Sequence, residues 1–196
     1  MRKFKLIFKK NLTLMALLIF VIFLSIFIVN FLEEKISSQQ SLIGGSFELI
    51  DEDSKLYKSK KIKKKKLIYF GYTFCPDVCP FDLIKLSKFL DQNPEMEKNV
   101  QAIFISVDPQ RDTPKTINSF LENFNPSIKG LTGTQEQIKD LTKKFGVYYR
   151  YNKVEENDKD YLIDHSSFFF LLEKNDKYIT HFHPQDFNSL VFKYLN

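Results

Sequence analysis

The order of apolar segments along the sequence predicts an α/β domain with a mixed sheet, preceded by one N-terminal apolar helix. Three observations support this fold class. An uncharged stretch covers residues 11–32. Two compact apolar runs, 67–72 and 100–107, are each followed by apolar residues at helical spacing. Shorter runs typical of strands follow toward the C-terminus, so a strand–helix–strand–helix core is expected to gain antiparallel strands.

Composition and charge exclude wholesale disorder and argue against nucleic-acid binding. The 196 residues are 43% hydrophobic, which is enough to bury a core. The formal net charge is +5, but residues 1–32 hold five basic and no acidic residues. The remainder therefore has 29 − 5 = 24 basic against 24 acidic residues and is formally neutral. Positive charge confined to the N-terminus indicates membrane topology and not a surface for phosphates.

The uncharged stretch 11–32 is predicted to be an uncleaved transmembrane signal anchor, with a buried core helix as the alternative. As a helix it spans roughly 33 Å, enough for a hydrocarbon core of about 30 Å. It is longer than the apolar region of a signal peptide and has no small-residue cleavage site. By the positive-inside rule the basic leader 1–10 stays in the cytoplasm. We therefore expect a bacterial inner-membrane protein with a polar tether, 33–43, and a periplasmic domain, 44–196.

Turn residues and apolar spacing predict the elements of the exported domain in order. They are a turn and short strand at 44–51, a buried strand at 67–72, a helix from near Pro80, a strand at 100–107, a helix capped by Thr113 with Pro114 as its first residue, a helix at 137–145 ended by Gly146, strands at 147–151, 167–172 and 178–182, and a short helix after Pro184. The last two strands are expected to form a hairpin. The lysine-rich run 58–66 is interpreted as a solvated turn, with contact to anionic lipid or an acidic partner as the alternative.

The chain has two cysteines, Cys75 and Cys79, placed where a buried strand gives way to a helix. A structural disulfide is the plain interpretation in an oxidising compartment. A bridge across so short a loop contributes only about 2 kcal/mol, however, and a domain of this size needs no such constraint. A helix N-terminus also stabilises thiolates. These arguments favour a reactive or metal-binding pair.

The spacing C-x-x-x-C separates the cysteines by one helical turn, so their sulfurs can bond to each other or bind one metal ion. Two thiolates and one imidazole form a soft ligand set that is one short of a closed structural zinc site. Copper, as Cu(I) or Cu(II), is therefore the favoured ion. His165, in a polar group just before an apolar run, is preferred as the third ligand. His181 and His183, on one face of a predicted strand, are the alternative pair.

Two blocks of the sequence resemble the signature of the Sco/SenC family: YFGYTFCPDVCP at 69–80 and VDPQRDTP at 107–114. The similarity continues through 130–133, 147–149 and 164–166. Members of this family are membrane-anchored copper chaperones of cytochrome c oxidase assembly. The resemblance implies a thioredoxin-like fold with a mixed central sheet. It also implies one copper ion bound by Cys75, Cys79 and His165 and delivered to the dinuclear copper centre of cytochrome c oxidase subunit II.

The resemblance implies a binding protein and not an enzyme. We expect the reduced thiols to be the form that binds copper, and oxidation to a Cys75–Cys79 disulfide to release the ion. Asp77 is not expected to bind the ion; we expect it to support the ligands or to contact a partner protein. The alternative function is that of a periplasmic thiol–disulfide oxidoreductase or redox sensor that uses the same two cysteines. Besides subunit II, a further copper chaperone or a thiol reductase is an expected partner, and nucleic acid is not.

The acidic and basic residues of the second block are expected to be structural. Asp112 and Thr113 are predicted to cap the helix at Pro114. Arg111 is predicted to pair with a nearby carboxylate. A direct role of Asp108, Arg111 and Asp112 in copper transfer is the alternative.

Overall fold

The computed structural model describes residues 15, 17–32, 43–153 and 160–195, and it divides the chain into two units, Met1–Ser41 and Leu42–Asn196. In the first unit, residues 17–32 form a helix with exposed apolar side chains. Over the part of the chain that is described, no helix combines the length and the apolar character needed to span a membrane. The leader 1–10, residues 11–14 and 16 of the predicted anchor and residues 33–42 of the tether lie outside the described residues. The anchor stays a prediction.

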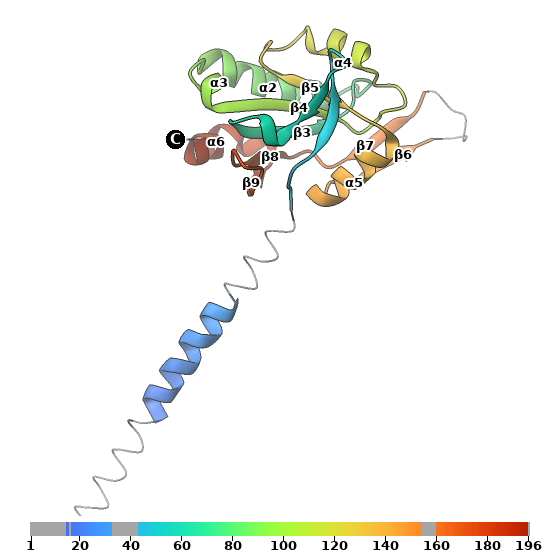
Figure 1. Ribbon diagram of the computed structural model, residues 1–196. Coiled ribbons are helices and arrows are strands. Elements are labelled where there is room, and N and C mark those ends of the chain that lie inside the picture. The colour runs from blue at the N-terminus through green and yellow to red at the C-terminus, as the bar shows by residue number, and fades with distance from the viewer. Residues whose placement is uncertain (1–14, 16, 33–42, 154–159, 196) are drawn as a thin grey trace, which may run out of the picture. The chain divides into compact units, whose positions relative to one another are not determined.

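The second unit is built on a seven-stranded mixed sheet with the strand order β2-β1-β5-β4-β3-β8-β9 (Figure 1). Its strands are β1 (Glu48–Asp51), β2 (Leu56–Lys58), β3 (Lys65–Gly71), β4 (Val100–Ser106), β5 (Lys129–Thr132), β8 (Phe169–Leu172) and β9 (Tyr178–Phe182). The central strands β3, β4 and β5 are parallel, and the outer strands pair antiparallel. The predicted α/β class with a mixed sheet and the predicted β8–β9 hairpin are confirmed.

Helices cover both faces of this sheet (Figure 1). The helices are α2 (Val78–Gln92), α3 (Met96–Asn99), α4 (Pro114–Leu121), α5 (Gln135–Phe145) and α6 (Phe187–Leu195), with 3-10 turns η1 (Ser59–Lys61) and η2 (Pro184–Asp186). On one face α4 packs Phe120 at 5.6 Å from Phe104, and α2 meets α6 through their aromatic rings. On the other face Phe145 of α5 lies 5.3 Å from Phe70. Two successive right-handed crossovers explain why α2 and α4 share a face.

Local signals account for the helix ends. The Thr113 side chain accepts a hydrogen bond from the Thr116 N–H at the start of α4, as predicted. Gly146 ends α5 in the left-handed conformation, with φ at 66°. The helix predicted from near Pro80 begins two residues earlier, at Val78, so Cys79 lies within its first turn.

Three strands were missed by the sequence prediction. β2 and β5 have only three and four residues, too few for an alternation pattern to be recognised. The third, β7 (Leu162–His165), pairs with β6 (Tyr149–Asn152) in a separate two-stranded sheet. His165 thus ends its own strand, and a short loop separates it from β8.

The interpretation of residues 58–66 as a solvated turn is only partly right. Lys60, Lys61 and Lys63 are exposed. Lys66, in contrast, is fully buried, and its Nζ lies 2.6 Å from a carboxylate oxygen of Asp176. Because Lys66 is already part of β3, its side chain is directed into the interior and needs a buried counter-charge.

Candidate metal centre

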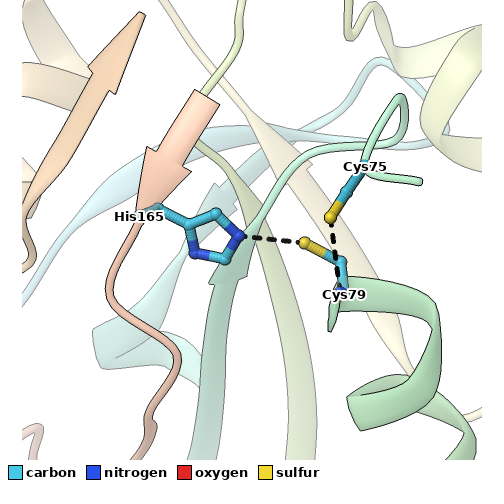
Figure 2. Close-up of side chains that lie close together, drawn as sticks. All are labelled: Cys75, Cys79 and His165. Carbon is cyan, nitrogen blue, oxygen red and sulfur yellow. Dashed lines mark hydrogen bonds between the residues drawn. The ribbon is translucent and has the colours of Figure 1, made fainter. Parts of the chain in front are cut away.

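Cys75, Cys79 and His165 come from three different elements and meet at one point (Figure 2). Cys75 lies in the loop after β3, Cys79 in the first turn of α2, and His165 at the end of β7. The His165 Nε2 atom is 3.1 Å from the Cys79 Sγ atom. The Cys75 sulfur accepts a hydrogen bond from the Cys79 N–H at 3.5 Å. All three donor atoms lie within 4.8 Å of one another.

This spacing fits a single metal ion. Donors that surround an ion at about 2.3 Å in a trigonal arrangement are about 4 Å apart. Neither cysteine is in a disulfide, so both sulfurs are available to an ion. Among the residues that the structure describes, no other group of three or more histidine, cysteine or acidic side chains could hold one. The soft donors favour copper over a closed zinc site.

The other two histidines do not join this group. The ring of His183 packs on Phe168, with ring centres 4.2 Å apart. His181 contacts the same phenyl ring, and its Nδ1 atom lies 2.5 Å from the Tyr178 hydroxyl. Burial and the nearby His183 lower the pKa of His181. The structure thus brings His165, and not the alternative pair, to the cysteines.

Hydrogen bonding orients the His165 ring. Its Nδ1 atom lies 3.1 Å from the Ser166 carbonyl oxygen. Because a carbonyl oxygen only accepts hydrogen bonds, Nδ1 carries a proton, and this contact turns Nε2 toward the Cys79 sulfur. The rings of Tyr69 and Tyr72 stand nearly perpendicular to the imidazole, with ring centres 6.3 and 5.9 Å away. The imidazole is therefore oriented for binding through Nε2.

The two thiols have opposite electrostatic environments. The Cys79 thiol, then His165 and two backbone N–H groups, donate hydrogen bonds that lower the pKa of Cys75 to about 3. Burial, followed by the neighbouring Cys75, raises the pKa of Cys79. The metal-free protein therefore holds a Cys75 thiolate beside a Cys79 thiol. A position at a helix N-terminus predicts an acidic thiol, but for Cys79 the loss of hydration outweighs the helix dipole.

Two residues that the sequence analysis did not consider as site residues hold the centre in place. A Cβ atom at Gly71 would lie only 2.9 Å from the Cys79 Sγ atom, so only glycine leaves room for this sulfur. Asp82, buried in α2, accepts hydrogen bonds from the hydroxyls of Tyr69 at 3.0 Å and Ser167 at 2.6 Å. In the sequence, the one sign of a role for Asp82 is that its carboxylate falls on the apolar face of the predicted helix.

Asp112 does not cap α4, contrary to the prediction. It is buried beneath the loop that leads to Cys75 and accepts hydrogen bonds from the Thr73 N–H at 2.9 Å, the Thr73 hydroxyl at 2.6 Å and the Ser106 hydroxyl at 2.5 Å. Burial raises the pKa of Asp112. The cap comes from Thr113 alone. The predicted pairing of Arg111 with a carboxylate is confirmed, because its Nε lies 2.5 Å from an oxygen of Asp108.

The sequence and the fold are similar to those of known proteins. A model of the SCO1/SenC family matches residues 35–195. The chain is 42% identical over 155 residues to an SCO2-like protein of Rickettsia prowazekii, covering 79% of this chain and 73% of that protein. Bradyrhizobium japonicum ScoI with copper bound is 37% identical, with a TM-score of 0.68 over 78% of this chain and 99% of that one. Yeast Sco1 with copper bound is 33% identical, with a TM-score of 0.69 over 78% and 88%.

Proposed function

Because the chain belongs to the SCO1/SenC family, we propose that it binds one copper ion through Cys75, Cys79 and His165 and delivers it to the dinuclear copper centre of cytochrome c oxidase subunit II. The convergence of three soft donor atoms within 4.8 Å carries this proposal. The copper-bound structures of similar proteins support the choice of ion. In this function copper is the cargo and not a permanent cofactor.

Each ligand contributes a different property to such a site. The Cys75 thiolate is partly exposed and charged before the ion arrives, so it offers the first contact. Cys79 is fully buried and loses its proton when the ion binds. The Ser166 carbonyl holds the imidazole with Nε2 toward the site. Three ligands with one partly exposed side leave the ion accessible to the ligands of an acceptor.

A second function, thiol–disulfide exchange, is favoured by the acidity of Cys75. A partly exposed thiolate beside a buried thiol can attack a partner disulfide, after which the second thiol resolves the mixed disulfide. The resulting Cys75–Cys79 disulfide has no thiolate left for copper. Redox chemistry and copper binding therefore exclude each other at this site at any one time.

We also propose that residues 11–32 anchor the protein in a bacterial inner membrane, with residues 44–196 in the periplasm. The apolar side chains exposed along the helix at 17–32 support this placement. Carbonate extraction of membranes and protease treatment of spheroplasts measure it. Extraction of the intact chain into the soluble fraction would contradict the anchor.

Copper titration of the reduced full chain in detergent micelles tests the copper site. We expect one Cu(I) per chain. Cys75→Ser, Cys79→Ser or His165→Ala should each weaken the affinity more than about 100-fold. Loss of a residue that only supports a ligand typically costs 10- to 100-fold in metal affinity, and loss of a ligand itself should cost more. His183→Ala is the matched control and keeps the affinity of the original protein. Binding that needs both cysteines but ignores His165 would show that the ligand set is wrong. Absence of copper binding together with rapid disulfide exchange would favour the oxidoreductase.

A further inference from the structure

His181 and His183, close to the C-terminus, form a second group of side chains that can bind a metal ion. They flank Phe182, which is buried, and both are exposed. His183 directly follows β9 and keeps an extended backbone, with φ at −68° and ψ at 149°. The two histidines therefore lie on the same face of the chain, with Cα atoms about 6.5–7 Å apart. At this spacing two imidazoles that lean toward each other can share one ion through bonds of about 2 Å.

A single phenyl ring packs against both imidazoles. The Phe168 ring centre is 4.2 Å from that of His183 and 5.1 Å from that of His181. Phe170, which pairs with His181 across β8 and β9, contacts the same imidazole, with ring centres 5.6 Å apart. Side chains that are already held in place lose little conformational entropy when they bind a ligand. The packing therefore prepares both rings for a shared ion.

Each imidazole of the pair has a nitrogen available to a metal ion. The His181 Nδ1 atom is 2.5 Å from the Tyr178 hydroxyl oxygen. A hydroxyl oxygen can accept a hydrogen bond, so this contact allows Nδ1 to carry the proton and Nε2 to bind the ion, as in many metal sites. Neither ring nitrogen of His183 has a hydrogen-bond partner within the part of the chain that the structure describes. Partial burial and the nearby His183 lower the pKa of His181, so near pH 7 this imidazole is neutral and needs to lose no proton.

The histidine pair is separate from the three-ligand centre. Residues that face each other across β8 and β9 share a face of the sheet, so His181 lies on the same face as Phe170. Phe170 contacts Phe145 of α5, with ring centres 5.4 Å apart, so this is the face that α5 covers. Cys79 lies on α2, which covers the opposite face. The two sites can therefore be occupied at the same time.

The donor atoms of the pair determine which ion it binds best. Imidazole suits Cu(II), Ni(II) and Zn(II), and among these ions a nitrogen site binds Cu(II) most tightly. Among the described residues no third histidine, cysteine or acidic side chain lies close enough to join the pair. Water must therefore complete the coordination. With only two protein ligands, an ion here is bound less tightly than at the three-ligand centre.

We propose that His181 and His183 bind one Cu(II) ion, with water as the remaining ligands, at a second copper site of this chain. The site shares no ligand with the centre formed by Cys75, Cys79 and His165. It therefore goes beyond the proposed function, and it binds Cu(II) whether the two cysteines hold Cu(I) or are joined in a disulfide. Each chain can then carry two copper ions, a tightly bound Cu(I) and an exchangeable Cu(II).

Cu(II) titration tests the proposal in the full chain in detergent micelles, with both thiols removed by Cys75→Ala and Cys79→Ala. We expect one Cu(II) per chain and an electron paramagnetic resonance spectrum with two coordinated imidazole nitrogens. In this background His181→Ala and His183→Ala should each weaken the Cu(II) affinity more than about tenfold, since loss of a supporting residue alone typically costs 10- to 100-fold. His165→Ala is the matched control, because it removes the imidazole of the other centre, and it should leave the Cu(II) affinity unchanged.

Several results would overturn the second copper site. They are an unchanged Cu(II) affinity in the His181 and His183 variants, a loss of Cu(II) binding in His165→Ala, and a spectrum with one coordinated imidazole instead of two. If the thiol-free chain does not fold, the intact chain with its cysteines oxidised to the disulfide takes its place, with the same expected results. The Cu(I) affinity of the reduced chain tests the proposed function separately. His181→Ala should leave that affinity unchanged, and a loss would show that the two sites are not separate.

Discussion

Replacement of Gly71 by alanine is expected to disturb the metal centre without touching a ligand. The new Cβ atom would lie 2.9 Å from the Cys79 Sγ atom and 3.0 Å from ring atoms of Phe104 and Tyr69. Ordinary contacts begin near 3.4 Å, so the sulfur must move by at least 3.4 − 2.9 = 0.5 Å if the rings stay in place. The rings of Phe104 and Tyr69 are fully buried, and the Tyr69 hydroxyl donates a hydrogen bond to Asp82, so neither ring moves freely. Overpacking of this kind costs about 1–3 kcal/mol of unfolding free energy.

The copper affinity of Gly71→Ala should fall about 10- to 100-fold, the range typical of changes next to metal ligands, because donor positions are tolerated only within about 0.2 Å. Competition with a chromophoric Cu(I) chelator measures the affinity, and urea unfolding measures stability. Gly146→Ala is the matched control. Gly146 has a φ of +66°, so alanine there is strained by about 1–2 kcal/mol, yet no atom lies within 4 Å of the added Cβ. Equal copper affinities of the two variants would refute the steric argument.

Three further predictions concern the cysteine protons, Asp112 and Lys66. Because the pKa of Cys75 is lowered to about 3 and that of Cys79 is raised, copper binding near pH 7 should release about one cysteine proton. The logarithm of the copper affinity should then fall with falling pH with a slope near one. Calorimetry in buffers of different ionisation enthalpy measures the number of protons released. Asp112→Asn should lower the unfolding free energy by about 1–3 kcal/mol, because its amide group would face the hydroxyl and N–H donors of the Cys75 loop. Lys66→Met should lower the unfolding free energy by about 3–5 kcal/mol, since the buried Asp176 carboxylate loses its counter-charge, while copper affinity stays unchanged. Urea unfolding measures the stability, and chelator competition measures the affinity.

Each of these predictions has a clear opposing result. Release of two cysteine protons would mean that Cys75 is a thiol in the metal-free protein. Asp140→Asn, at an exposed position of α5, is the control for Asp112, and equal effects of the two would contradict the role of the buried hydrogen bonds. Lys63→Met serves the same purpose for Lys66, since Lys63 is exposed in the same lysine-rich run. A small loss for Lys66→Met would show that water reaches Asp176.

Much of the fold could be predicted because its signals are local. The strands at 67–72 and 100–107 are continuous apolar runs, and Thr113, Pro114 and Gly146 mark helix ends through interactions within a few residues. The one-turn spacing of Cys75 and Cys79 is equally local, and it indicated that their sulfurs could share an ion. Short strands such as β2 and β5 have too few residues to show an alternation of apolar and polar side chains. They can be recognised only when the strand that they pair with is known.

The tertiary structure decided what depends on contacts between distant segments. His165 lies 86 residues from Cys79, and the sequence could only rank it against His181 and His183. The same holds for Lys66 and Asp176, which pair across 110 residues, and for Asp112, whose partners lie in β4 and the Cys75 loop. Burial has no local signature for polar residues, and it reversed the expected acidity of Cys79. The sequence by itself determined which donor groups were available, whereas packing determined which of them meet and in which protonation state.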